Sequence, residues 1–188
     1  MPDLAPLTAL GGIAARKLVH GPLTLEEDPA LALASLALRR GAARPAPFDL
    51  VLPEPGGWTR QGGIAAFWTG PDQWMIEAPG RAETDFAAGI AAQAPGCSIT
   101  EQTDGFAAFE ITSSAGEAPI HAVMVKLVNI DPARFPPGSA TRTGLEHMTV
   151  FVIRRATDRL AVLGMRSAAG SVWHALANAV SRLPVPRA

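Results

Sequence analysis

The chain has 188 residues, of which 48% are hydrophobic and only 18% are charged, and its formal net charge at pH 7 is −1. A near-neutral chain lacks the basic surface that nucleic acid requires, so we expect no nucleic-acid partner. The single cysteine, Cys97, excludes an internal disulfide and a multi-cysteine metal site. No apolar run approaches the length that spans a membrane, and the first residues do not resemble a secretory leader. We therefore expect a cytoplasmic protein without a membrane partner.

Residues 1–47 are predicted to form an N-terminal arm and the first strand or strands. The first ten residues contain Leu4, Leu7 and Leu10 together with two prolines. This segment is too short and too interrupted for a stable helix, and too apolar for an ordinary solvated tail. We expect the first 10–12 residues to form an extended arm that is ordered by a partner or a symmetry mate and not by this domain, with the three leucines at the interface.

Residues 31–38 have two interpretations. Their Ala and Leu content favours a helix, with Asp28 as its cap and Pro29 at the first helical position. Their apolar spacing also alternates at two residues, as it does in a strand. Composition alone favours the helix.

Residues 48–96 are predicted to form the first α+β half. Residues 63–69 and 73–78 are a strand pair around a tight Gly-Pro-Asp turn, because the aromatic and branched residues on either side suit a half-buried pleated surface. Residues 81–94 are predicted to be a helix that ends at a Pro-Gly pair. Trp58 lies in a preceding segment rich in proline and glycine, where a small core is least able to cover it, so we expect it at an interface.

Residues 97–188 are predicted to form the second α+β half. Asp104 and Gly105 are a strong hairpin signal that should join strands at 98–103 and 106–112. A helix at 116–128 and a proline-rich loop at 131–138 follow, and then come strands at 140–147, 148–155 and 159–165. The last helix should cover residues 167–182, with Ser167 as its cap.

The order of these elements predicts the fold class. Strands that arrive in pairs with one helix between them are typical of an α+β fold. We expect mainly antiparallel sheets with helices on one face, arranged as two split-βαβ-like halves within one compact unit. No sequence repeat with a clear period accompanies the two halves.

No constellation in the sequence points to catalysis. The paired glycines at 11–12 and 62–63 lack the spacing of a phosphate-binding loop, and no nucleophile elbow is present. The four histidines are scattered and form no metal-binding pair. We therefore expect no catalytic residue, no metal site and no bound cofactor on this chain.

Two residues are candidates for a vestigial pocket. Asp104 could hydrogen-bond a pterin ring, and the alternative is a plain hairpin turn. Arg142 follows the proline-rich loop and could bind an anion or a carboxylate of a partner, and the alternative is a capping role.

Several segments, taken in order, resemble the sarcosine oxidase gamma subunit family. They are residues 5–7 near the start, the Gly-Pro-Asp-Gln-Trp hairpin at residues 69–79, the Asp-Gly segment at 101–106, residues 127–132 and 135–138, residues 141–145, and residues 165–167 leading to 173–176. The resemblance covers roughly residues 60–180 and extends to the folate-binding aminomethyltransferase-like superfamily. It implies that superfamily's fold, and it places a strand at residues 31–38.

The resemblance also implies a function. Heterotetrameric sarcosine oxidase oxidatively demethylates sarcosine to glycine and transfers the one-carbon unit to tetrahydrofolate. Membership would make this chain the gamma subunit, a structural and assembly subunit without its own active site, with alpha, beta and delta subunits as partners. FAD, FMN, NAD and tetrahydrofolate would then be bound by the other subunits. Whether the chain has any enzymatic role beyond that complex stays open.

Two other functions remain alternatives. One is a stand-alone folate-binding protein of the same superfamily that acts in one-carbon transfer or iron–sulfur assembly. The assembly proteins carry a Lys-Gly-Cys motif, whereas the corresponding stretch at residues 135–143 has no cysteine and no acidic residue. The other alternative is an isolated interaction domain, which differs only in its partner.

Overall fold

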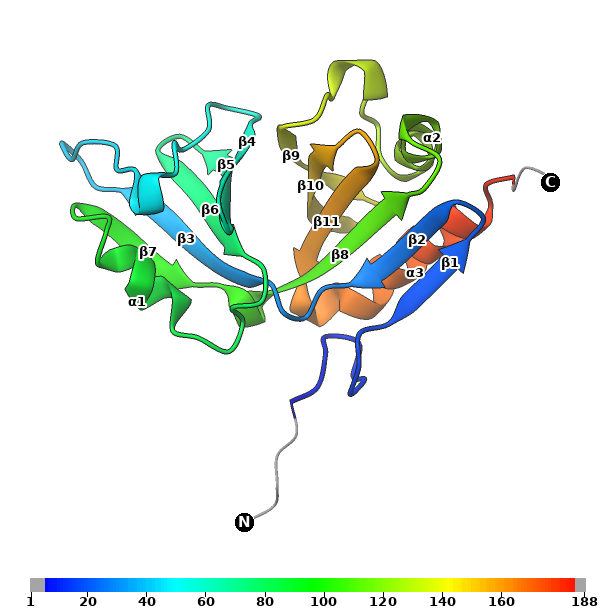
Figure 1. Ribbon diagram of the computed structural model, residues 1–188, viewed down its shortest axis with the longest axis horizontal. Coiled ribbons are helices and arrows are strands. Elements are labelled where there is room, and N and C mark those ends of the chain that lie inside the picture. The colour runs from blue at the N-terminus through cyan, green and yellow to red at the C-terminus, as the bar shows by residue number, and fades with distance from the viewer. Residues whose placement is uncertain (1–5, 185–188) are drawn as a thin grey trace, which may run out of the picture.

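The computed structural model describes residues 6–184 and arranges them in two antiparallel sheets (Figure 1). The six-stranded sheet has the order β1-β2-β8-β11-β10-β9, and the five-stranded sheet has the order β4-β5-β6-β3-β7. The strands of the first sheet are β1 (Lys17–His20), β2 (Leu23–Glu27), β8 (Phe106–Ser113), β11 (Arg159–Met165), β10 (Met148–Ala156) and β9 (Ser139–Leu145). Those of the second are β4 (Trp58–Gln61), β5 (Ile64–Gly70), β6 (Gln73–Ala78), β3 (Ala32–Leu38) and β7 (Cys97–Glu101).

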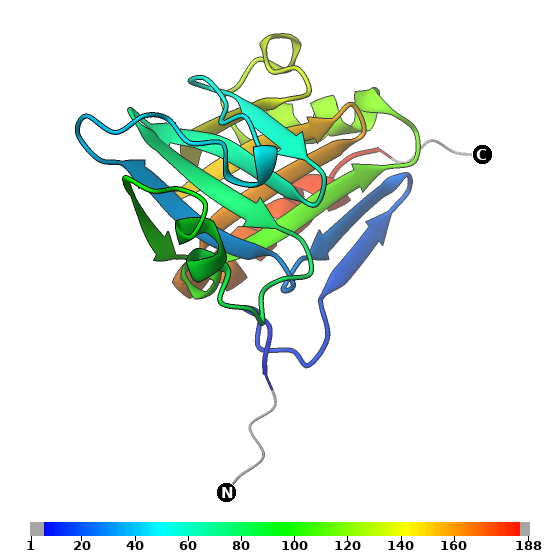
Figure 2. The same cartoon turned by 60° about the vertical axis from the view of Figure 1, so that its left-hand side comes forward.

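Three helices cover the outer faces of the sheets, and the inner faces pack on each other. Helix α1 (Phe86–Ala91) contributes to the apolar cluster of the five-stranded sheet, and α2 (Glu117–Leu127) and α3 (Ala169–Ser181) cover the six-stranded sheet. Figure 2 shows the five-stranded sheet lying in front of the six-stranded one. A third apolar cluster lies between the sheets, where the rings of Phe67 and Phe151 are 5.1 Å apart between centroids.

The fold class predicted from the sequence is confirmed: the chain is α+β with antiparallel sheets. Helix α1 connects β6 to β7, and both of these strands pair antiparallel with β3 between them, which is a split βαβ arrangement. The strand interpretation of residues 31–38 is also confirmed, because β3 is the fourth strand of this sheet. Within residues 6–184, no helix has the length and apolar character needed to cross a membrane.

The chain crosses between the sheets at two neighbouring places, once from β2 to β3 and once from β7 to β8. The backbone N–H of Gln102 donates to the carbonyl of Leu33 at 2.8 Å, and the N–H of Asp28 donates to the carbonyl of Ala108 at 2.9 Å. These bonds hold the two crossover segments side by side. The sheets do not follow the predicted division of the chain at residues 47 and 96, since β1 and β2 join the C-terminal strands and β7 joins the N-terminal ones. That these three segments are separate folding units stays a prediction.

The predicted hairpin at Asp104 and Gly105 is wrong. Strand β7 pairs with β3, whereas β8 pairs with β2 and β11 in the other sheet. Residues Thr103–Gly105 form a short 3₁₀ helix, and Gly105 lacks the positive φ that an Asp-Gly hairpin turn requires. The Thr103 hydroxyl accepts the N–H of Leu33 at 3.0 Å and fixes the chain at this crossing.

Two of the predicted helices, those at residues 81–94 and 167–182, begin later in the structure than the sequence predicted. The helix expected at 81–94 is shorter, because the N–H groups of Arg81 and Ala82 donate to the carbonyl of Ala30 and not to a helix. The helix begins after Asp85, whose carboxylate accepts the N–H of Ala88 at 3.0 Å. Ser167 does not cap the last helix. It lies in a 3₁₀ helix, Arg166–Ala168, that precedes α3.

Candidate functional site

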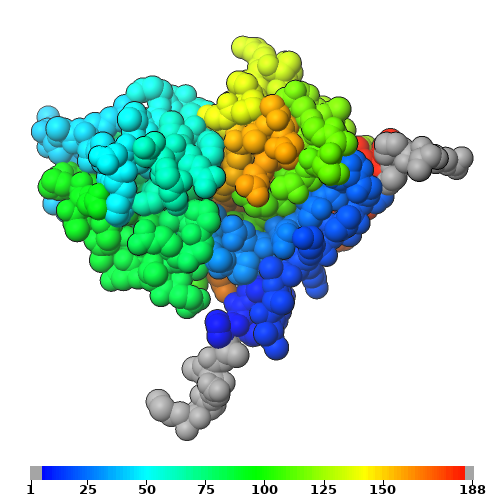
Figure 3. Space-filling view, in the orientation of Figure 1, coloured from blue at the N-terminus to red at the C-terminus, as the bar shows by residue number. Residues whose placement is uncertain are grey.

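A cleft of about 580 Å³ opens where the two crossover segments meet. This volume lies within the range of about 300–1,000 Å³ that is typical of ligand pockets. In Figure 3 the blue N-terminal segment lies at the lower end of the seam between the two lobes. The cleft is lined by the N-terminal segment at residues 6–9 and 13, by the two crossovers at 27–31, 33, 103, 104 and 106–108, by the β6–α1 loop at 80, 82 and 83, and by Arg166.

Acidic side chains dominate the polar lining of the cleft, with four carboxylates and a single guanidinium. Glu27 is 3% exposed, and its carboxylate accepts the backbone N–H of Leu10 at 3.1 Å and that of Arg16 at 3.3 Å. Asp28 accepts the N–H of Ala30 at 3.2 Å. Burial raises the pKa of Asp28 above its ordinary value, although this hydrogen bond opposes the shift.

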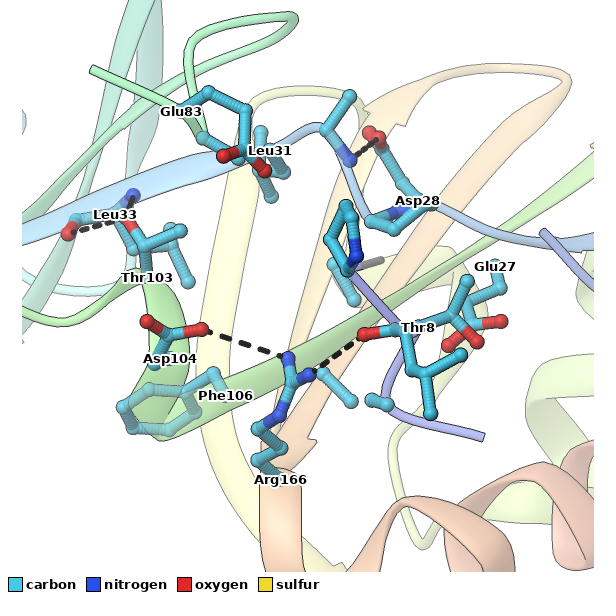
Figure 4. Close-up of a pocket in the computed structure, with 18 of the residues that line it drawn as sticks. Thr8, Glu27, Asp28, Leu31, Leu33, Glu83, Thr103, Asp104, Phe106 and Arg166 are labelled. Carbon is cyan, nitrogen blue, oxygen red and sulfur yellow. Dashed lines mark hydrogen bonds and ion pairs between the residues drawn. The ribbon is translucent and has the colours of Figure 1, made fainter. Parts of the chain in front are cut away.

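Arg166 joins the N-terminal segment to the second crossover (Figure 4). Its guanidinium donates to the carbonyl of Leu7 at 3.1 Å and lies 3.8 Å from the carboxylate of Asp104. Figure 4 shows Asp104 and Thr8 on opposite sides of this guanidinium. The cation therefore holds one wall of the cleft against the other.

The N-terminal segment was expected to be ordered by a partner only, and this is wrong for residues 8–12. Thr8 is buried, its N–H donates to the carbonyl of Gly12 at 2.9 Å, and Glu27 and Arg166 fix the neighbouring backbone. Leu7 lines the cleft and is 53% exposed, Leu10 packs against the core of the six-stranded sheet, and Leu4 lies outside the described residues. That these leucines contact a partner stays a prediction.

The two candidates for a vestigial pocket are not brought together. Asp104 lies at the rim of the cleft with its side chain 95% exposed. Arg142 is exposed on the edge strand β9, opposite Phe151, and is not among the described residues that line the cleft. A shared role for Asp104 and Arg142 in one pocket therefore has no geometric support.

A second cavity, of about 130 Å³, lies between the sheets and shares Asp28 and Leu31 with the cleft. An ion network lines it and joins both sheets. The guanidinium of Arg155 on β10 pairs with both carboxylate oxygens of Glu77 on β6, with Nη2 2.9 Å from Oε2, and its Nε donates to Glu110 on β8 at 2.7 Å. Glu77 is fully buried, so this bidentate pair is removed from water.

Trp58 belongs to this network. Its indole N–H donates to Glu77 at 2.7 Å, and the Arg155 guanidinium lies 5.5 Å from the centroid of its ring. Trp58 is half-buried and packs against the apolar cluster between the sheets. That Trp58 contacts a partner stays a prediction. Within the fold, Trp58 donates a hydrogen bond to the buried Glu77 and packs between the sheets.

The two carboxylates of the network differ in their hydrogen bonding: both oxygens of Glu77 accept a bond, whereas one oxygen of Glu110 does not. Burial raises the pKa of Glu110 to about 7, although the charges of Arg155 and Arg159 oppose the shift. Its Oε2 is buried without a hydrogen-bond partner among the described residues, and Arg159 Nε lies 3.5 Å away. Burial alone would lower the pKa of Arg155, but the charges of Glu77 and Glu110 raise it, so Arg155 stays protonated.

The sequence analysis missed Glu27, Glu77, Glu110 and Arg155. The available signal was a charged residue inside an otherwise apolar strand, as in Trp-Met-Ile-Glu-Ala at residues 74–78. A charge that is buried in this way needs a partner.

The lining of the cleft suits a ligand that carries cationic and apolar groups. Carboxylates, two threonine hydroxyls and apolar side chains line it, and none of its lining residues within 6–184 is a histidine or a cysteine. Over the same residues, no three His, Cys, Asp or Glu side chains converge as a metal-binding group.

Comparison with known proteins identifies the fold and no sequence family. No family model matches the chain, and no curated protein matches it. A chain of heterotetrameric sarcosine oxidase from Corynebacterium sp. U-96, solved in complex with pyrrole 2-carboxylate, is similar with a TM-score of 0.70 at 18% identity, over 90% of this chain and 91% of that one. Glycine cleavage system aminomethyltransferase T from Bartonella henselae is similar with a TM-score of 0.54 at 12% identity, over 80% of this chain.

These likenesses define the class of fold. The chain shares its fold with a chain of that sarcosine oxidase and with part of that aminomethyltransferase, as the fold implied by the sequence resemblance required. It spans only 44% of the aminomethyltransferase chain, whereas it spans nearly the whole of the sarcosine oxidase chain.

Proposed function

We propose that this chain is the gamma subunit of a heterotetrameric sarcosine oxidase, a non-catalytic structural and assembly subunit. One observation carries the proposal: the fold is similar to that of a chain of such an enzyme, over 90% of this chain and 91% of the other. A chain that matches a subunit over most of both lengths is suited to the same place in an assembly. The ordered sequence segments at residues 60–180 support the same function.

The cleft is lined by carboxylates, threonine hydroxyls and apolar side chains. In this proposal these groups bind and position neighbouring subunits. In this proposal the alpha, beta and delta subunits bind FAD, FMN, NAD and tetrahydrofolate, and the complex demethylates sarcosine in the cytoplasm. This chain contributes surfaces that hold the larger subunits together.

The alternative is a stand-alone folate-binding protein that acts in one-carbon transfer or iron–sulfur assembly. The observation that favours it is the volume of the cleft, about 580 Å³, which is large enough for a pterin, with carboxylates that could accept its N–H groups. The fourfold excess of carboxylates over guanidinium in the same cleft opposes it, because the glutamate tail of folate is itself anionic.

Affinity purification of the tagged full chain from its native host tests the proposal. We expect flavin-containing subunits to co-purify in a fixed ratio, and the purified complex to release hydrogen peroxide when sarcosine is added. Deletion of the gene should abolish this activity in extracts, and re-expression should restore it. A chain that purifies alone and binds 5-formyltetrahydrofolate in calorimetry would replace the proposal with the alternative.

A further inference from the structure

We propose that the cleft is a docking site for a segment of a partner subunit that carries a basic side chain next to an apolar one. The basic side chain enters the cleft toward Asp28 and Glu83, and the apolar side chain covers Leu7 and Ile13. This inference rests on the proposed function and names the surface through which the chain would bind its partner.

The charge of the cleft specifies the basic side chain. Two of its four carboxylates are engaged by other groups: Glu27 accepts two backbone N–H groups, and Asp104 faces Arg166. Asp28 accepts a single backbone N–H, from Ala30, and Glu83 is exposed on the β6–α1 loop, so these two carboxylates keep the most capacity to accept hydrogen bonds from a ligand. A guanidinium or ammonium group between the walls would balance this charge where water is partly excluded.

The lip of the cleft specifies the apolar side chain. Leu7 is 53% exposed and Ile13 is 86% exposed, and both line the cleft together with the half-buried Phe106. Exposed aliphatic side chains around a pocket with a few polar groups are typical of an interaction site. Because Ile13 lies at the exposed edge of the cleft, a small amine bound inside would leave the Ile13 side chain uncovered. A polypeptide segment would cover both the carboxylates inside the cleft and Ile13 at its edge.

The walls of the cleft are fixed before a partner arrives. Arg166 bonds the carbonyl of Leu7, Glu27 bonds the N–H of Leu10, and the two crossovers are hydrogen-bonded to each other. A pre-formed groove loses little conformational entropy when it binds. Figure 4 shows Glu83 on the side of the cleft away from Arg166. A partner would therefore meet the carboxylate of Glu83, whereas Arg166 faces the carboxylate of Asp104.

Charge reversal at one exposed residue tests the proposal in the assembled complex. Glu83→Lys should weaken association of this chain with the co-purifying subunits by tenfold or more in biolayer interferometry, with an unchanged melting temperature of the free chain. Ile13→Ser should weaken it about three- to tenfold. The matched control is Glu146→Lys, which makes the same charge change at an exposed residue in the β9–β10 turn that does not line the cleft, and it should bind as the wild type does.

A peptide supplies a readout that does not depend on sarcosine oxidase. We expect acetyl-Leu-Arg-Leu-Arg-Leu-amide to shift backbone amide NMR signals of the cleft residues in the isolated full chain, and the Glu-containing counterpart to shift none. Glu83→Lys should remove the shifts. If n-butylammonium shifts the same signals as strongly as the peptide does, the site is one for small amines and the docking proposal is overturned.

The two readouts separate failure of the docking site from failure of the proposed function. If the wild-type chain assembles and Glu83→Lys assembles equally well, the docking proposal is overturned and the proposed function stands. If the chain finds no sarcosine oxidase partner, the proposed function fails and the peptide decides: saturable shifts at the cleft support docking of a basic segment, and their absence up to millimolar peptide overturns it.

Discussion

The two cavities of this molecule share Asp28 and Leu31 and differ in how their charges are balanced. Three carboxylates and three guanidiniums line the small cavity between the sheets, and most of them are paired with one another. Four carboxylates and one guanidinium line the open cleft. Paired charges at the small cavity join one sheet to the other, whereas the unbalanced charge of the cleft is available to something outside the fold.

This difference separates residues needed for folding from residues available for binding. Arg155 links three strands, β6, β8 and β10, that belong to two sheets. Asp104 and Glu83, by contrast, are exposed at the edge of the cleft. Substitutions at the small cavity should therefore change stability, and substitutions at the cleft should change association.

The largest effect on stability is expected from Arg155→Met. Removing the guanidinium leaves Glu77 buried without its counter-charge, and breaking a buried pair in this way costs about 3–5 kcal/mol. Urea unfolding followed by circular dichroism measures the free energy. Arg142→Met, at an exposed arginine of β9, is the control, and it should change stability by less than about 0.5 kcal/mol. Equal effects from the two variants would mean that the network does not hold the sheets together.

The next effect concerns pH. The pKa of Glu110 is about 7 in the folded chain and above its ordinary value, so the folded state binds a proton more tightly than the unfolded state does. The stability that this group contributes is therefore greatest at low pH and falls as pH rises from about 4.5 through about 7, by an amount on the order of 3 kcal/mol. The raised pKa of Asp28 acts in the same direction.

Glu110→Gln isolates this contribution, because glutamine keeps the shape and does not titrate. The difference in unfolding free energy between the wild type and this variant should change between pH 5 and about pH 8 and then level off. A difference that stays constant over this range would mean that Glu110 is ionised throughout, and that Arg155 and Arg159 compensate for its burial.

A smaller effect is expected from Trp58→Phe. The substitution keeps an aromatic ring against Arg155 but removes the N–H that donates to Glu77, which costs about 1–2 kcal/mol for a buried acceptor that loses a donor. Thermal and urea unfolding measure this cost. If Trp58 also faces a partner, Trp58→Ala should weaken assembly by more than the loss of stability explains, and Trp58→Phe should preserve assembly.

Local features of the fold could be predicted from the sequence. Residues 73–78 are mostly apolar, with Trp, Met and Ile in succession, and follow a Gly-Pro-Asp turn, and β6 occupies those residues. The strand pairs in the C-terminal part, β9 with β10 and β10 with β11, also follow from turns between neighbouring segments. In these cases the information that sets the pairing lies within a few residues.

The sheet membership of β7 and β8 could not be predicted in the same way. Asp104 and Gly105 signal a turn, but a turn signal does not specify which strand pairs with which, and here the chain leaves one sheet for the other. The ion network is subject to the same limit. Glu77 and Arg155 are 78 positions apart and meet only because the two sheets pack together. Only the charges inside apolar strands indicated that a partner was needed.

The smallest effect is expected from Glu27→Gln, at the boundary between the two regions. The carboxylate of Glu27 accepts the N–H of Leu10 through one oxygen and that of Arg16 through the other, whereas an amide has a single acceptor oxygen. One of the two bonds is lost, at a cost of about 1 kcal/mol. Hydrogen exchange of residues 8–16 should become faster, while exchange in the strands around Arg155 stays unchanged. Because the N-terminal segment forms one wall of the cleft, this variant should also weaken association modestly, and faster exchange without any loss of association would show that a partner orders this wall when it binds.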